Sequence, residues 1–132
     1  EAARAYEAEI AGFLGADAAP GFDLVLLGIG EDGHVASLFP GNPALLETKR
    51  LVAPVRNAPK PPSERITLTL PVLNRARHLL VVATGVGKAE ALAGVFSPGG
   101  APALPAQQLH PRDGDLHWLL DRAAAVKLKD SP

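Results

Sequence analysis

Residues 22–34 read Phe22-Asp23-Leu24-Val25-Leu26-Leu27-Gly28-Ile29-Gly30-Glu31-Asp32-Gly33-His34, and this stretch decides the fold. Its first half is a mainly apolar run of strand length. Such a run is typical of a strand buried on both faces of a parallel sheet. The glycine-rich half follows at once, at the carboxyl end of that strand. Because open α/β sheets bind their ligands at this end, residues 28–34 are the first candidate site.

The sequence on both sides predicts helices alternating with strands. Before the stretch, Tyr6, Ile10, Phe13 and Leu14 share a helical face that Gly15 ends, and a polar turn follows over 17–21. After it, three more strands are expected, over 51–55, 65–69 and 78–84. Short helices are expected over 71–77 and 88–96, and loops over the proline-rich segments 56–64 and 97–105. This order predicts an α/β fold with a largely parallel sheet.

The last segment of the chain is expected to form a helix. Its apolar residues recur with helical spacing at Leu116, Leu119, Leu120 and Ala123. Asp113 and Asp115 are the candidate capping residues at its start.

The composition is that of one globular domain. The chain has 132 residues, of which 47% are hydrophobic and 20% are charged, which is typical of a soluble domain rather than a disordered segment. A net charge of −1 provides no general attraction for nucleic acid or for an anionic membrane. The longest apolar run is too short to span a bilayer. Cysteine is absent, which excludes disulfides and thiolate metal sites and fits a cytoplasmic location.

The first residues predict that the domain is incomplete. Methionine is absent, including at position 1, and the helical pattern of residues 1–6 has no capping residue before it. A secretory signal is not expected either, because the first ten residues lack an apolar segment. We therefore expect residues 1–132 to be part of a longer chain.

The spacing of Gly28, Gly30 and Gly33 matches the dinucleotide-binding pattern Gly-x-Gly-x-x-Gly. That pattern requires a long helix beginning at the third glycine, to receive the pyrophosphate. Pro40 follows only seven residues after Gly33, and helices rarely pass through a proline. Residues 54–58, after the next predicted strand, also lack an acid to bind a ribose. The sequence therefore argues against a nicotinamide cofactor.

Asp32 and His34 are the candidate catalytic residues of this turn. Histidine titrates near neutrality and is suited to take a proton from water. Glycine backbone approaches a ligand closely and presents N–H groups to developing negative charge. An aspartate that caps a helix, followed by a histidine that merely packs, fits the same spacing, and the spacing alone does not separate the two.

Two other kinds of site are not supported. Ser37 lies close to His34, but the glycines of a nucleophile elbow do not flank it, so we expect Ser37 to make local backbone hydrogen bonds. The histidines at positions 34, 78, 110 and 117 show no metal-ligand spacing, and no cysteine assists them. We therefore expect no metal.

Lys88 and Arg65 are candidate phosphate ligands. Gly85-Val86-Gly87-Lys88 resembles half of a phosphate-binding loop, although Val82 and Ala89 stand where a full nucleotide-binding loop has Gly and Ser or Thr. A lysine behind a glycine turn and a buried strand suits a phosphate, and a guanidinium at the start of a strand can bind one with two hydrogen bonds. Lys88 alone fits a solvated surface position equally well, and a lone arginine such as Arg65 is more often a surface residue.

Four segments together resemble the 6-phosphogluconolactonase family, in its order and with compatible spacing. They are Leu26-Leu27-Gly28-Ile29-Gly30-Glu31-Asp32-Gly33-His34-Val35-Ala36-Ser37-Leu38-Phe39-Pro40, Glu64-Arg65-Ile66-Thr67-Leu68-Thr69-Leu70-Pro71, Thr84-Gly85-Val86-Gly87-Lys88-Ala89-Glu90-Ala91-Leu92 and Trp118-Leu119-Leu120-Asp121-Arg122-Ala123-Ala124. The resemblance implies a Rossmann-like three-layer α/β sandwich, of which residues 1–132 are the C-terminal part of a single domain.

The resemblance also implies a reaction and the residues that perform it. The reaction is hydrolysis of 6-phospho-D-glucono-1,5-lactone to 6-phosphogluconate in the oxidative pentose phosphate pathway, without metal or organic cofactor. His34 would be the general base, and Asp32 would orient His34 or a sugar hydroxyl. Backbone N–H groups around Gly28, Gly30 and Gly33 would stabilise the oxyanion, and Arg65 and Lys88 would bind the 6-phosphate. We expect a monomer or a weak homo-oligomer that binds a phosphorylated sugar lactone and neither nucleic acid nor membrane.

Two alternatives stay open beside the lactonase. Glucosamine-6-phosphate deaminases resemble this chain in the Gly-x-Gly-x-Asp-Gly-His turn, but they continue with Phe-Asn-Glu-Pro, where this chain has Ser37-Leu38-Phe39-Pro40 and no acid. The other alternative is a sugar-phosphate-binding domain without catalysis, because the longer family members supply further site residues from a part absent here.

Overall fold

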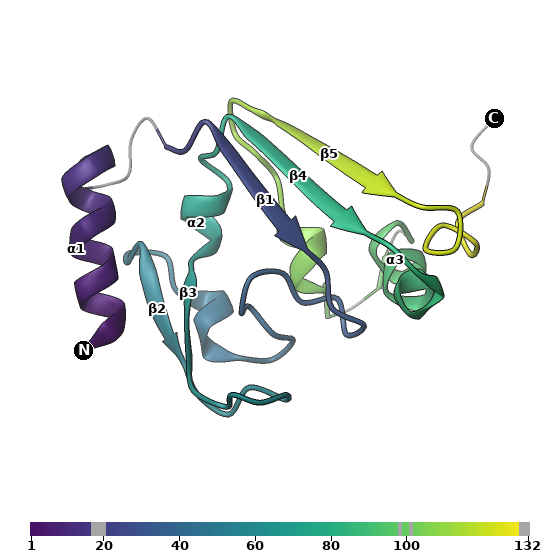
Figure 1. Cartoon of the computed structure of the whole chain (residues 1–132), viewed down its shortest axis with the longest axis horizontal. Helices are drawn as coiled ribbons and strands as arrows, with labels where there is room; N and C mark the ends of the chain where they lie inside the picture. The colour runs from purple at the N-terminus through teal and green to yellow at the C-terminus, as the bar shows by residue number, and fades with distance from the viewer. Residues whose placement is uncertain (17–20, 98, 101, 130–132) are drawn as a thin grey trace.

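The computed structural model describes residues 1–16, 21–97, 99–100 and 102–129 (Figure 1). The predicted turn at 17–21 lies almost wholly outside the described residues. No helix in the described ranges combines the length and hydropathy needed to cross a membrane.

The centre of the molecule is a parallel sheet of three strands in the order β1-β4-β5. Strand β1 (Leu24–Gly28) pairs with β4 (His78–Ala83), and β4 pairs with β5 (Asp115–Leu120). All three strands point the same way, so their carboxyl ends meet at one edge of the sheet (Figure 1). The predicted α/β class and parallel sheet are confirmed.

Strand β5 corrects the prediction of a C-terminal helix. Leu116, Trp118 and Leu120 are half-buried and pack onto the core, while the residues between them are exposed. This alternation has the period of a strand. The leucines also fit helical spacing, but the edge of β4 offers a full row of backbone partners, and this tertiary pairing overrides the local pattern. Asp115 therefore starts a strand instead of capping a helix.

The sheet is covered on one face only, as far as the described residues go. Val25 and Leu27 of β1 are buried in the core with Leu79 and Val81 of β4. The alternate side chains of β1 are open, with Leu24 55% and Leu26 63% exposed. The prediction that both faces of this strand are buried is wrong for these residues, because the core that packs against β1 lies on one side.

A second small unit consists of one helix and two antiparallel strands. Helix α1 (Ala2–Leu14) ends at Gly15, whose φ of 93° suits glycine, as predicted. The helix packs against β2 (Val52–Val55), which pairs with β3 (Arg65–Leu68). Ile10 is buried under this contact, but Phe13 of the predicted apolar face is 94% exposed. Figure 1 shows this unit beside the parallel sheet.

Short helices connect the strands. Helix α2 (Leu70–Leu73) has Pro71 in its first turn as predicted, yet it ends earlier than expected, at Asn74. There the Asn74 side chain donates to the Gln108 carbonyl and accepts from the His110 N–H.

Helix α3 (Ala89–Val95) follows a single 3-10 turn, η2 (Val86–Lys88). Two further 3-10 helices are η1 (Pro43–Leu46) and η3 (Pro105–Gln108).

Glu7 joins α1 to the start of β2. One carboxylate oxygen accepts from the Leu51 N–H at 2.6 Å and the Val52 N–H at 3.2 Å, and the other accepts from Arg50 at 3.2 Å. Burial raises the pKa of Glu7, but these hydrogen bonds outweigh it and hold the pKa below its ordinary value. The stabilisation is therefore present above the unfolded pKa and is lost as pH falls through the folded one.

The substitution Glu7→Gln tests this connection between α1 and β2. We expect the free energy of unfolding at neutral pH to fall by about 1 kcal/mol, because a partly exposed charged acceptor is lost. The difference from wild type should shrink in acid, where Glu7 itself is protonated. Urea unfolding at both pH values measures this, with Glu9→Gln on the exposed side of the same helix as control. An equal deficit at both pH values would contradict the ionic role.

Candidate active site

The turn after β1 is closed by its own backbone. The Gly30 N–H donates to the His34 carbonyl at 2.9 Å, and the Gly33 N–H donates to the Gly30 carbonyl at 3.0 Å. Gly33 has a φ of 81°, in the left-handed region that glycine tolerates. The N–H groups of Gly30 and Gly33 are thus used inside the turn, whereas Glu31 N–H has no acceptor among the described residues.

Asp32 and His34 form a close pair on this turn. Asp32 Oδ1 lies 2.5 Å from His34 Nδ1 and also accepts from the His34 backbone N–H at 3.1 Å. Burial raises the pKa of Asp32, but the hydrogen bonds from the His34 ring and backbone outweigh it, so the pKa lies below its ordinary value. An anionic Asp32 favours a proton on Nδ1. The other ring nitrogen, Nε2, is then the proton acceptor.

Gly30 leaves the space that the His34 ring occupies. A Cβ at position 30 would lie 2.0 Å from His34 Nδ1 and 2.8 Å from Asp32 Oδ1, closer than atoms can approach. Gly28, in contrast, has no atom within 4 Å of such a Cβ. These two of the three predicted site glycines therefore differ: packing requires a glycine at position 30, while no crowding requires one at position 28.

Phe39 and Arg65 complete the surroundings of His34. The Phe39 ring is 3% exposed and lies 4.4 Å from the His34 ring between centroids, at a tilt of 42°. The Arg65 guanidinium carbon lies 5.2 Å from the Phe39 ring centroid, in cation–π contact. Sequence reasoning missed Phe39, because the chain turns back between it and His34, at Ala36 with a φ of 51°.

Arg65 is also bound to the proline loop that precedes it. Its Nε donates to the Pro62 carbonyl at 2.9 Å, and its Nη2 donates to the Lys60 carbonyl at 2.9 Å. No partner is found for Nη1 within the described residues. Arg65, the predicted phosphate ligand, thus holds a loop with two of its nitrogens.

The turn after β4 lies beside the turn after β1. Gly85 has a φ of 88°, and its N–H donates to both carboxylate oxygens of Asp121, at 3.0 and 3.1 Å. A Cβ at Gly87 would lie 3.3 Å from Glu31 Oε1, so the two turns are in contact. Lys88 follows, half-buried, and no ion pair is found for it within the described residues.

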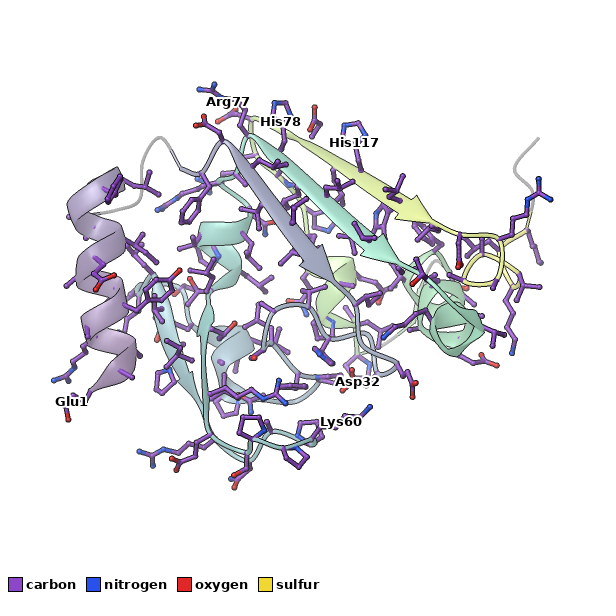
Figure 2. The ribbon with its side chains drawn as sticks, viewed as in Figure 1. Glu1, Asp32, Lys60, Arg77, His78 and His117 are labelled. Carbon is purple, nitrogen blue, oxygen red and sulfur yellow. The ribbon has the colours of Figure 1, made fainter. Side chains whose placement is uncertain are left out.

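A cleft of about 440 Å³ is lined by Asp32. Phe39, Arg56 and Pro59 also line it. A larger hollow of about 690 Å³ includes Arg65 but lies toward the start of α1. We assign the chemistry to the smaller cleft, because it contains the carboxylate that binds His34. Figure 2 shows Asp32 at the carboxyl ends of the strands, away from His78 and His117 at their start.

Ser37 differs from its prediction. Its backbone N–H donates to Thr67 Oγ1 at 3.1 Å, while its hydroxyl has no hydrogen bond among the described residues. Within the same residues, no group of three His, Cys, Asp or Glu side chains converges as metal ligands would.

Comparisons with known proteins show which sequences this chain is similar to. A 6-phosphogluconolactonase from Rattus norvegicus is 49% identical over 125 residues, covering 95% of this chain and 48% of the relative. One from Mycobacterium tuberculosis is 47% identical over 128 residues, covering 96% of this chain and 51% of the relative. The chain therefore spans about half the length of the curated relatives it matches.

Similarity extends to solved structures. The 6-phosphogluconolactonase from Trypanosoma cruzi superposes with a TM-score of 0.83 at 37% identity, covering 97% of this chain and 51% of that one. Residues 1–118 match the model of the glucosamine-6-phosphate isomerases/6-phosphogluconolactonase family. That match takes in the glycine turn, the Asp32–His34 pair and the Lys88 turn, and the chain belongs to this family.

Proposed function

We propose that this chain carries the catalytic base of a 6-phosphogluconolactonase, which hydrolyses 6-phospho-D-glucono-1,5-lactone to 6-phosphogluconate. The observation that carries the proposal is the 2.5 Å contact between Asp32 Oδ1 and His34 Nδ1. This contact orients the imidazole and leaves Nε2 as the base. The names of the similar proteins support the substrate.

His34 Nε2 takes a proton from water in the proposed reaction, and the water oxygen attacks the lactone carbonyl carbon. The positive charge on the imidazole is stabilised by Asp32. As the tetrahedral intermediate collapses, the bond to the ring oxygen breaks, and Nε2 returns the proton to that oxygen. The N–H of Glu31 has no acceptor among the described residues, and it is a donor of this turn for the oxyanion.

Lys88 and Arg65 bind the 6-phosphate in this proposal. A phosphate monoester carries a charge of about −1.5 to −2 at neutral pH, and the chain as a whole has a net charge of −1. Specific cations must therefore hold it. Lys88 stands on the turn that contacts Glu31 of the catalytic turn. Arg65 lies over Phe39, which packs on His34, and its Nη1 has no partner among the described residues.

The deaminase alternative is less well supported. Its catalytic histidine needs the glutamate that stands immediately before the proline in Phe-Asn-Glu-Pro, and Phe39 stands there in this chain. Phe39 instead packs on His34. We therefore expect no ammonia release from glucosamine 6-phosphate.

The length of this chain, compared with that of its relatives, indicates which part of a domain it contains. We propose that residues 1–132 are the C-terminal part of a single α/β domain, because the chain spans about half of its relatives. The open apolar face of β1 agrees with this.

We further propose that the protein is a monomer or a weak homo-oligomer. We propose a cytoplasmic location, because the chain has no cysteine that needs an oxidising compartment.

Opening of 6-phosphogluconolactone by the purified chain tests the proposal. Acid release at constant pH measures the rate, with spontaneous hydrolysis subtracted. A rate above the spontaneous one supports the lactonase. Saturable binding of 6-phosphogluconate without turnover supports the binding domain instead, and the absence of both contradicts the two proposals together.

Lys88→Ala and Arg65→Ala test the phosphate site. Each should raise KM for the phosphorylated lactone about tenfold or more, because a charge-assisted hydrogen bond is lost. Neither should change kcat/KM for the unphosphorylated gluconolactone, which makes no such contact. Steady-state kinetics on both lactones measure this, with the exposed Lys129→Ala as control. Equal losses on both substrates would argue against phosphate contact.

A further inference from the structure

Asp121 connects two loops at the carboxyl edge of the sheet. It directly follows β5, and its backbone N–H donates to the Ala83 carbonyl at the end of β4, at 3.3 Å. Its carboxylate accepts the Gly85 N–H at 3.0 and 3.1 Å, and Oδ1 also accepts the Ala124 N–H at 2.7 Å. One side chain thus ties the loop after β5 to the turn after β4.

The hydrogen bonds from the Gly85 N–H to Asp121 anchor the turn after β4. Gly85 has a φ of 88°, so its backbone reverses direction there. Its carbonyl accepts the Lys88 N–H at 3.2 Å, which closes the 3-10 turn. The position of Lys88 therefore depends on Gly85, and Gly85 is bound on its N–H side by Asp121 alone among the described residues.

We propose that Asp121 is a positioning residue that fixes the Lys88 turn for binding of the substrate phosphate. The proposal rests on the proposed function, because it assumes that Lys88 binds phosphate. Asp121 touches no substrate; it acts through Gly85. The carboxylate accepts two backbone N–H groups, and these offset its charge near an anionic ligand.

The charge of Asp121 allows a direct test. A role through charge and a role in positioning the turn predict opposite changes in phosphate affinity when the carboxylate is removed. If only charge mattered, removing the carboxylate would strengthen phosphate binding by reducing repulsion. If Asp121 positions the turn, removing it weakens binding although a negative charge is lost. An asparagine keeps an acceptor oxygen and loses the charge, so Asp121→Asn separates the hydrogen bond from the charge.

A purely local role is the remaining rival. Asp121 also caps the turn that follows it, through Ala124 N–H and through its carbonyl, which accepts the Ala125 N–H at 3.1 Å. A local cap would affect residues 121–125 and leave Gly85 and Lys88 as they are. Amide hydrogen exchange of Gly85 and Lys88, followed by NMR, therefore reports the positioning role independently of catalysis.

The experiment compares Asp121→Ala, Asp121→Asn and the wild-type chain, with Asp113→Ala as control. Asp113 is exposed, and its side chain has no hydrogen bond within the described residues. NMR titrations use 6-phosphogluconate and, as the unphosphorylated probe, gluconate. For Asp121→Ala we expect amide exchange of Gly85 to rise and binding of 6-phosphogluconate to weaken, each about tenfold. Gluconate binding should stay unchanged, and Asp121→Asn should retain most of both properties.

The outcomes separate this proposal from the proposed function. If the wild type binds 6-phosphogluconate and Asp121→Ala binds it equally well or better, the Asp121 assignment alone is overturned. Unchanged exchange at Gly85 overturns it too, in favour of the local cap. If the wild type binds no 6-phosphogluconate, the phosphate site fails, and the assignment of Asp121 fails with it.

Discussion

His34→Ala is expected to abolish enzyme-dependent opening of 6-phosphogluconolactone. A positioned general base contributes about 10²–10⁴-fold, and no other imidazole lies on the glycine turn. The ring is held on one side by Asp32 at 2.5 Å and on its face by Phe39. Alanine at position 34 has no group that can accept the proton. Binding of 6-phosphogluconate should change little, because Lys88 and Arg65 are untouched. Initial rates and an NMR titration measure the two effects separately.

His110→Ala is the matched control for this substitution. His110 is exposed and is not part of the glycine turn; it follows η3 in the chain. Its replacement should leave the rate unchanged. An active His34→Ala chain would remove His34 as the base and, with it, the mechanism proposed above.

Gly30→Ala is expected to reduce the rate almost as strongly as loss of the histidine. The added methyl group would lie 2.0 Å from His34 Nδ1, 2.1 Å from Cε1 and 2.8 Å from Asp32 Oδ1. The backbone cannot easily yield, because Gly30 N–H and carbonyl are both bonded within the turn. The imidazole must therefore swing away from Asp32. Misplacement of a catalytic group by about 1 Å costs on the order of 10²-fold, and the loss should appear in kcat.

Gly12→Ala is the control for the effect of a methyl group alone. A Cβ at Gly12, within α1, meets no atom within 4 Å, and alanine there should raise the free energy of unfolding by about 0.5–1 kcal/mol. Circular dichroism checks that Gly30→Ala remains folded. A folded Gly30→Ala chain with unchanged kcat would show that the orientation of His34 does not limit the reaction.

Much of the site follows from the sequence because its geometry is local. Asp32 and His34 are two residues apart, and Gly30 and His34 four, so chain connectivity brings them together once the turn forms. The strands near 52–55, 65–68 and 78–83 are likewise visible in the sequence, because their β-branched and apolar runs stand between proline and glycine segments. Each of these strands differs from its predicted range by one residue.

The C-terminal strand shows where local patterns fail. Leu116, Leu119 and Leu120 satisfy helical spacing, while Leu116, Trp118 and Leu120 satisfy the alternation of a strand. The two patterns are both present in the same residues. The strand forms because residues Asp115 to Leu120 pair with His78 to Ala83 of β4. The free edge of β4 that they pair with exists only once the sheet has assembled.

The amino-acid sequence alone therefore specifies the α/β class, the glycine turn and the Asp32–His34 pair. The tertiary structure decided the packing of Phe39 on His34, the position of Arg65 over Phe39, and the bond from Gly85 to Asp121. Gly85 and Asp121 are 36 residues apart, and nothing in either local sequence indicates the other. Such contacts require that two chain segments be brought together against their loop entropy, and only the packed core and the assembled sheet do this.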